Sequence, residues 1–448
     1  MGVGDFPGSN TSVSYSYTFR FAEDSMKRMH VPFFRPDLGE QEIEEVVATL
    51  RSGWLTSGPR VRRFEEEFAA ALGARHAVAL NSCTAALHLA VEALGLKPGQ
   101  AVLVPTMTFA ATAEVVRYQG AIPILVDCDP ETTNMDLDDA ARKVASLRSG
   151  RLPDALPKDA RVVGIMPVHV GGTMMNIEQV KRFASDHNLW IVEDAAHAFP
   201  AAWRRRSGES WQRCGERTAT VTCFSFYANK TITTGEGGMA VTDDASLAER
   251  IRVMSLHGLS HDAWGRYSGN GSWDYRITAP GYKYNLTDIA AAIGIHQLAR
   301  AEEMRSAREA IACRYLDGLA DVDEIELPPS CSNRIHTWHL FPIKLHLQRL
   351  VVNRNVFVEE LRSRGIGFSV HWRPLHLHPY YQQAFGWQPG DCPVATTNWE
   401  RLVSLPIFSG MLDHDVDYVI RSLKTLCSSF SVKARNTCKP MLVCANEA

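Results

Sequence analysis

Between about residues 72 and 242, short apolar runs alternate with segments that have the spacing of amphipathic helices. Apolar runs without a polar face are typical of strands that are buried on both sides of a sheet. We expect strands at 76–80, 101–104, 122–126, 162–168, 190–192, 218–225 and 238–242, and helices at 38–50, 60–72, 83–94, 109–118, 137–146 and 177–187. This alternation predicts an α/β fold with a largely parallel sheet covered by helices.

Beyond about residue 285 the order of predicted elements changes. A long helical pattern over 285–319 leads into a mixed segment, with strands expected at 337–345 and 367–371 and helices at 356–364 and 413–426. We therefore expect a large domain over residues 31–284 and a smaller C-terminal α+β domain over 285–427. Residues 1–30 lack periodicity, so we expect them to form a loose extension. Residues 428–448 carry no clear pattern, and we expect them to form a tail.

The composition excludes several broad classes of protein. The formal net charge is −3, which gives no support for nucleic acid or an anionic membrane as the main partner. No apolar run approaches the roughly 20 residues needed to span a bilayer, and no secretory signal is expected. The ten cysteines form no C-x-x-C pair, which disfavours a structural zinc or iron–sulfur site and suits a reducing compartment. We expect a cytoplasmic protein.

One lysine stands in unusual surroundings. Lys230 lies between a predicted strand and a glycine-rich bend, in the segment FSFYANKTITTGEGG (224–238), and its nearest charged neighbour in sequence is Glu236. A partly desolvated ammonium has a lowered pKa, which a lysine needs to form a Schiff base. Upstream, Asp194 ends a predicted buried strand, where it could also simply cap the next helix. A lysine and an acid at a strand end are the pair that a pyridoxal phosphate (PLP) site requires.

Other residues at strand ends are candidates for the same site, because ligands gather at the carboxyl ends of parallel strands. Cys83 and Thr84 open a helix, where backbone amides can hold a phosphate, although Ser82 could be an ordinary cap of that helix. Phe109 could stack on an aromatic ring or pack in the core. Ser225 could bind a phosphate or be an ordinary strand-end hydroxyl. Singly, these alternatives stay open.

Two further patterns invite a functional interpretation. Arg204-Arg205-Arg206 could form a basic patch, but a solvated loop is the more common role of such a run. His371, His376 and His378 invite a metal site, but solvated and stacking histidines are more common in such a loop. We expect no metal.

From about Val31 to Leu426 the sequence resembles the sugar-nucleotide aminotransferases of the DegT/DnrJ type, which are fold-type I PLP enzymes. The resemblance rests on SGWLTSGP (52–59), EDAAH (193–197), the segment 224–238 and GYKYNLTD (281–288). Within the family, the sequence looks closest to the enzymes that make UDP-4-amino-4-deoxy-L-arabinose. This closer likeness rests on LHGL (256–259), Asp262-Ala263, GYKYNLTDI (281–289) and, more weakly, HTWHLF (336–341). The resemblance implies a fold like that of aspartate aminotransferase, with a large PLP-binding domain and a smaller C-terminal domain.

The resemblance also implies a role for each matching residue. Lys230 would hold PLP through a Schiff base and then move a proton between substrate and cofactor, and Asp194 would bind the pyridine nitrogen. His197 would contact the 3-oxygen side of the ring, and Phe109 would stack on the ring. The phosphate would be bound by Cys83 through its backbone amide, by Thr84 and Ser225, and by Asn285 of the partner subunit. The active unit would then be a homodimer with shared sites.

The implied reaction transfers the amino group of L-glutamate to a nucleotide-linked 4-keto sugar, such as a UDP-4-keto-pentose, for cell-surface polysaccharide, lipid A or antibiotic sugar synthesis. One alternative changes the acceptor to a GDP- or dTDP-linked sugar or a 3-keto sugar. A second is a dehydratase on the same scaffold, which Lys230 disfavours because those relatives carry histidine at its position. A third is a non-catalytic regulatory protein with a PLP-enzyme fold, against which Lys230, Asp194, Ser225 and Asn285 together argue.

The chain departs from the family in a few places. The segment around Arg204–Arg213 is longer than is usual in relatives, and we expect a surface loop insertion there. Relatives begin near Val31 and stop near Leu426, so both terminal segments are additional.

Overall fold

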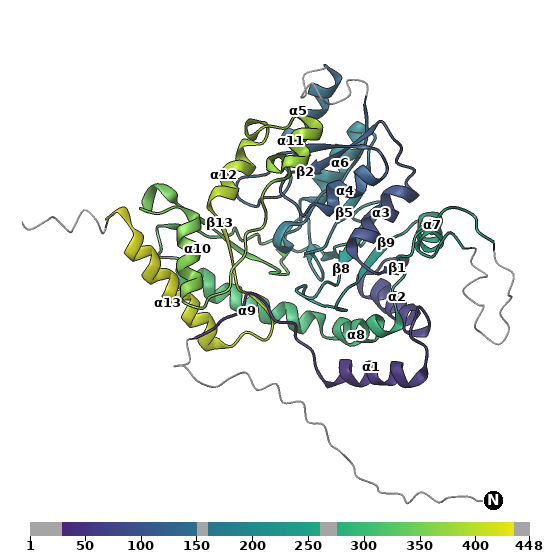
Figure 1. Cartoon of the computed structure of the whole chain (residues 1–448), viewed down its shortest axis with the longest axis horizontal. Helices are drawn as coiled ribbons and strands as arrows, with labels where there is room; N and C mark the ends of the chain where they lie inside the picture. Colours follow the sequence, from purple (N-terminus) through teal and green to yellow (C-terminus); the bar gives the residue numbers. More distant parts are fainter. Residues whose placement is uncertain (1–28, 150–159, 260–275, 434–448) are drawn as a thin grey trace, which may run out of the picture.

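A computed structural model describes residues 29–149, 160–259 and 276–433 (Figure 1). Its centre is a seven-stranded sheet in the order β1-β9-β8-β5-β4-β2-β3. Neighbouring strands are parallel except for β9, which pairs antiparallel with both β1 and β8. The bounds are β1 His76–Leu80, β2 Gln100–Pro105, β3 Ile122–Val126, β4 Arg161–Ile165, β5 Trp190–Asp194, β8 Val221–Ser225 and β9 Gly238–Thr242.

Helices cover both faces of this sheet, as expected for strands that are buried almost throughout. Helix α3 packs against β8 and β9, and α2 and α8 join a separate core cluster that contains Phe64, Phe68 and Phe224. Polar side chains set the helix starts: Ser82, Asp136 and Asn176 each accept a hydrogen bond from a backbone amide of the first turn. The bounds are α1 Glu40–Ser52, α2 Pro59–Leu72, α3 Cys83–Ala93, α4 Ala111–Tyr118, α5 Leu137–Arg148, α6 Ile177–His187, α7 Ala245–Ser255 and α8 Asp288–Ala299.

The C-terminal part forms a second, smaller α+β region with its own core, on the side of α10 and α13 in Figure 1. A three-stranded antiparallel sheet of β10 (Ile325–Glu326), β12 (Phe341–Leu345) and β13 (Leu402–Leu405) packs with helices. Those helices are α9 Ala301–Leu319, α10 Arg354–Ser363, α12 Pro393–Arg401 and α13 Asp413–Phe430. Helix α11 (Pro379–Phe385) instead packs Tyr381 and Phe385 into the core of the seven-stranded sheet. Buried Lys344 of β12 donates to the carbonyl oxygens of Pro130 and Glu131, which ties this region to the loop after β3. The domain boundary at residues 284 and 285 stays a prediction.

Most expected elements are present, and the differences have local causes. The strand expected at 367–371 is wrong: Ser369 forms an isolated bridge with Ser404, while 369–372 line a cavity. The strand expected at 337–345 begins only at Phe341, because Thr337 and His339 turn toward other partners. The long helix expected at 285–319 is broken at Arg300.

The segment around Arg204–Arg213 is a small hairpin of β6 (Ala202–Trp203) and β7 (Gln212–Arg213), paired with β11 (Arg334–Ile335). Residues 205–211 are exposed, which confirms the expected surface position of this segment. Its greater length than in relatives stays a prediction. Helix α13 continues to Phe430, past the expected start of the C-terminal tail. Asp262-Ala263, most of the N-terminal extension and residues 434–448 lie outside the described residues. Within the described ranges, every helix is too short or too polar to cross a membrane.

Candidate active site

A cavity of about 600 Å³ opens where β5 and β8 end and α3 begins. The structure brings the predicted residues of one chain together at this cavity: its lining includes Cys83, Thr84, Phe109, Asp194, His197, Ser225 and Lys230. They come from different elements, and the parallel strands place them at one edge of the sheet. Asn285 does not line the cavity.

Lys230 follows β8 in a turn in which its amide donates to the carbonyl oxygen of Tyr227 at 2.9 Å. Its Nζ lies 3.4 Å from Nε2 of His339. Burial lowers the pKa of Lys230 to about 8, with Asp194 and Cys83 acting against that shift and the Arg308 charge adding to it. A lysine with this pKa has a sizeable uncharged fraction near neutral pH, and the uncharged amine is the form that attacks a carbonyl carbon.

Asp194 is the last residue of β5 and is almost fully buried. Thr112 Oγ1 donates to Oδ2 at 2.7 Å, and the Ala196 amide donates to Oδ1 at 3.1 Å. Burial raises the pKa of Asp194, and these two hydrogen bonds act against it. The residues after Asp194 form turns and no helix, so the alternative of a helix cap is wrong. The Ala196 contact belongs to this local turn, and the carboxylate lines the cavity.

His197 presents a neutral imidazole to the cavity. Its Nδ1 accepts a hydrogen bond from the Gly171 amide at 3.2 Å, and burial holds its pKa well below the ordinary value. The hydrogen of the neutral ring therefore belongs on Nε2, which can donate. The ring stacks on Trp372, with centroids 5.3 Å apart and an interplanar angle of 16°.

The start of α3 forms the other wall. Ser82 Oγ accepts from the Ala85 amide at 3.1 Å, so Ser82 is indeed a cap, while the amides of Cys83 and Thr84 have no intrahelical acceptor. A Cβ on Gly238 would collide with the backbone of Ser82 and Cys83, so glycine is what lets β9 lie this close to the helix start. Burial raises the pKa of the Cys83 thiol well above its usual value, which leaves the backbone amide as the useful group of this residue.

Phe109 and Ser225 complete the lining. The Phe109 side chain is 63% exposed, so the alternative of core packing is wrong, and its ring is free to cover a flat ligand. Ser225 ends β8, and its Oγ accepts from the Tyr227 amide at 3.3 Å. That contact leaves the Ser225 hydroxyl hydrogen available for an acceptor in the cavity.

Asn285 lies beside the end of β1, bridged to Leu80, and its Nδ2 donates to Ser57 Oγ at 2.7 Å. Its predicted contact with a phosphate requires a second subunit and stays a prediction.

Sequence reasoning missed two residues of this site. Thr112 holds Asp194, and His339 lies against Lys230, but each is far from its partner in sequence. His339 is part of the HTWHLF run quoted for the resemblance, and that run was the available signal.

The three histidines of the 371–378 segment have separate environments. His371 stacks on Phe33 and its Nδ1 lies 2.9 Å from Ser404 Oγ. His376 is buried between the hydroxyls of Thr106 and Thr396, and the Nε2 of His378 contacts the Arg373 carbonyl oxygen. These are contacts of stacking and hydrogen-bonded side chains.

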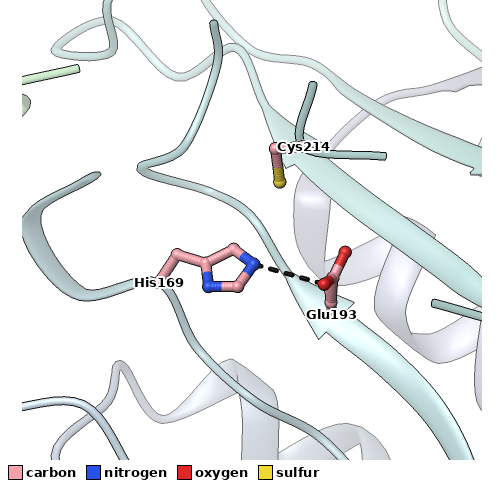
Figure 2. A group of neighbouring side chains, drawn as sticks. All are labelled: His169, Glu193 and Cys214. Carbon is pink, nitrogen blue, oxygen red and sulfur yellow. Dashed lines mark ion pairs between the residues drawn. The ribbon is translucent and has the colours of Figure 1, made fainter. Parts of the chain in front are cut away.

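A different cluster lies behind the cavity, around the strand that ends in Asp194. His169, Glu193 and Cys214 are buried together, with candidate ligand atoms all within 4.8 Å of one another (Figure 2). His169 Nε2 lies 3.4 Å from Glu193 Oε1, while Thr218 and Thr222 donate to Oε2. Burial raises the pKa of the Cys214 thiol well above its usual value. We interpret the cluster as support for β5.

Comparisons with known proteins agree with this arrangement. The model of the DegT/DnrJ/EryC1/StrS aminotransferase family matches residues 36–424. The chain is 43% identical to an uncharacterised protein of Methanocaldococcus jannaschii, MJ1066, over 90% of this chain and 99% of that one. It is 42% identical to the spore coat polysaccharide biosynthesis protein SpsC of Bacillus subtilis, over 89% of this chain and 98% of that one.

Among solved structures, the fold is similar to that of Spr1654 of Streptococcus pneumoniae, described as a sugar aminotransferase and solved in a PLP form. The TM-score is 0.78 at 30% identity, over 90% of this chain and 99% of that one. The α/β fold with a large, mostly parallel sheet is therefore confirmed. The chain belongs to the DegT/DnrJ/EryC1/StrS aminotransferase family.

Proposed function

We propose that this protein is a PLP-dependent aminotransferase that moves the amino group of L-glutamate to a nucleotide-linked keto sugar. The observation that carries the proposal is the convergence of Lys230, Asp194 and the start of α3 on one cavity. Two relatives support the sugar: Spr1654 is described as a sugar aminotransferase, and SpsC as a spore coat polysaccharide biosynthesis protein.

The residues of the cavity fit PLP. An amine, a carboxylate and a helix start with free amides match its aldehyde, pyridine nitrogen and phosphate. Asn229, beside Lys230 in the lining, has a buried Oδ1 without a hydrogen-bond partner, as expected where a ligand completes the site.

When bound, PLP supplies an electron sink for the carbon that loses a proton. Lys230 would hold the cofactor covalently, and its released amine would then move the proton as a general base and acid. Asp194 would hold the proton on the pyridine nitrogen, and His197 Nε2 would donate to the 3-oxygen that the ring carries. Phe109 would cover one face of the ring, while the amide of Cys83, Thr84 and Ser225 would bind the phosphate.

For the acceptor, we propose a UDP-linked 4-keto pentose or a similar sugar, with a GDP- or dTDP-linked sugar or a 3-keto sugar as the alternative. The resemblance of HTWHLF (336–341) and LHGL (256–259) to the enzymes of 4-amino-arabinose synthesis supports the first choice. We also propose that the protein acts in the cytoplasm as a homodimer with shared sites. The eight described cysteines are all unpaired, as expected in a reducing compartment.

A panel of UDP-, GDP- and dTDP-linked keto sugars with L-glutamate tests this proposal, with products identified by mass. We expect one of the sugars to gain an amine in place of its carbonyl oxygen, together with release of 2-oxoglutarate. The Lys230→Ala variant should lose this turnover, and full activity in that variant would contradict the assignment. Purified protein that stays colourless with added PLP would favour a regulatory protein that retains only the fold.

A further inference from the structure

Arg308, on α9, carries a buried charge close to the cavity but does not line it. Its side chain is 3% exposed, and among the described residues no carboxylate lies within ion-pair distance of its guanidinium. Nη1 donates to the carbonyl oxygens of Trp338, at 3.3 Å, and Ile407, at 2.9 Å, while Nε has no partner. Burying a cation without a carboxylate in ion-pair contact is unfavourable. We therefore expect the Arg308 guanidinium to have a role that a neutral side chain could not fill.

The Trp338 carbonyl lies at a strained point of the chain. Trp338 has a φ of 50°, in the left-handed region that a bulky residue rarely adopts. Its ring stacks on His336, and the preceding Thr337 donates to the His197 carbonyl oxygen at 2.6 Å. Such a conformation persists only where neighbouring contacts hold it, and the Arg308 hydrogen bond is one of them.

The residue after Trp338 is His339, which contacts Lys230. His339 Nε2 is 3.4 Å from Lys230 Nζ, and the His339 ring lies 4.2 Å from the His197 ring. Burial holds the pKa of His339 well below its usual value, so its imidazole is neutral and can accept a hydrogen from the lysine amine. A single side chain, Arg308, therefore supports the backbone that carries this histidine.

We propose that Arg308 is a positioning residue for Lys230: it holds Trp338 so that His339 rests against the amine. The positive charge of Arg308, on which the Asp37 carboxylate acts, also disfavours a second charge on the lysine. The inference rests on the proposed function of Lys230 as the amine that reacts with PLP. The other groups near Lys230 are Asp194 on β5 and Cys83 on α3, which favour the charged amine, and His197, His339 and His371, whose pKa values burial lowers.

The rate at which the PLP-free protein captures PLP, measured from pH 6 to pH 10, tests the proposal without measuring turnover. Only the uncharged amine reacts, so the rate rises with pH around the pKa of Lys230, which is about 8. We expect the midpoint to rise by about half a pH unit or more in Arg308→Met, because a neighbouring positive charge is removed. Arg308→Lys keeps the charge, and its midpoint should stay near that of the unchanged protein.

Arg308→Gln separates the two parts of the role, since it keeps an N–H donor for the carbonyl oxygens and loses the charge. Its midpoint should lie above that of Arg308→Lys, and this comparison decides the matter even if the methionine variant fails to fold. Equal midpoints in the glutamine and lysine variants would overturn the charge effect. Equal capture rates in the methionine and glutamine variants, compared above their midpoints, would overturn the positioning role. If the unchanged protein captures no PLP, the proposed function itself is wrong, which is a distinguishable result.

Discussion

The carboxylate of Asp194 is held by a hydroxyl from a different element. Thr112, on α4, donates to Oδ2 at 2.7 Å, and Thr108 Oγ1 lies 2.7 Å from Thr112 Oγ1. Burial raises the pKa of Asp194, and the Thr112 hydrogen bond is the largest effect that opposes the rise. The ionised carboxylate that a protonated pyridine nitrogen needs therefore depends on Thr112.

We expect Thr112→Val to weaken PLP binding by about tenfold or more, because a hydrogen bond to a charged group contributes roughly 1.5–3 kcal/mol. Thr112→Ser keeps the hydroxyl and is the matched control. Equilibrium titration of the PLP-free variants measures the dissociation constants. An unchanged constant in the valine variant would mean that the Thr112 hydroxyl does not control this carboxylate.

The role of a single residue was predictable from the sequence where the residues beside it in the chain are unusual for its type. Lys230 stands apart from other charges, and Asp194 ends an apolar run, so both can be recognised. Thr112 and Arg308 act only through partners far away in the chain, and nothing in their local sequence indicates those contacts. For His339 the HTWHLF run was a signal, but it does not reveal the contact with Lys230.

At the scale of elements, the phosphate end of the site depends on how closely β9 approaches α3. Gly238 pairs with Leu80 and Ser225, at the junction of three strands, and its Cα faces the backbone of Ser82 and Cys83. Any side chain there would push the helix start away from the strand.

Gly238→Ala should therefore lower both stability and PLP affinity, since overpacking of this kind costs about 1–3 kcal/mol. The matched control is Gly390→Ala, at a glycine whose added Cβ would meet open space. Thermal unfolding with and without PLP checks both effects. Equal unfolding temperatures in the two variants would show that β9 can move aside at no cost.

The elements themselves were largely predictable because buried strands have continuous apolar runs. The strands β1, β3 and β9 coincide with the expected ranges, whereas β8 starts only at Val221. Thr218 and Thr220 precede it and contact β5 through their side chains. The segment 367–371 has the apolar pattern of a strand, but its residues 369–371 line the cavity. A hydrophobic pattern does not distinguish these two roles. The antiparallel direction of β9 follows from the turn that carries Lys230, which contains no crossover helix.

At the scale of the whole molecule, the predicted contact of Asn285 with a phosphate requires a second subunit. Asn285 lies outside the cavity of its own chain, and its predicted phosphate contact is to the other site of a homodimer. Neither this contact nor the sheet order is readable from the sequence, because both depend on which surfaces meet after folding.

Mixing two inactive variants tests the shared site. Lys230→Ala and Asn285→Ala should each be weakly active or inactive, while dimers formed by refolding them together contain one intact site. Random pairing then restores about a quarter of the unmutated activity. If Asn285 acted within its own chain, the mixture would be no more active than the separate variants.

The central claim is that Lys230 is the covalent anchor of PLP. Its most direct test is borohydride reduction of the PLP-loaded protein, followed by peptide mass mapping, with Lys230→Ala and Lys283→Ala as paired variants. We predict a phosphopyridoxyl group on the peptide that contains Lys230, retained in Lys283→Ala and lost in Lys230→Ala. A label on another lysine, or no label in a protein saturated with PLP, would contradict the account.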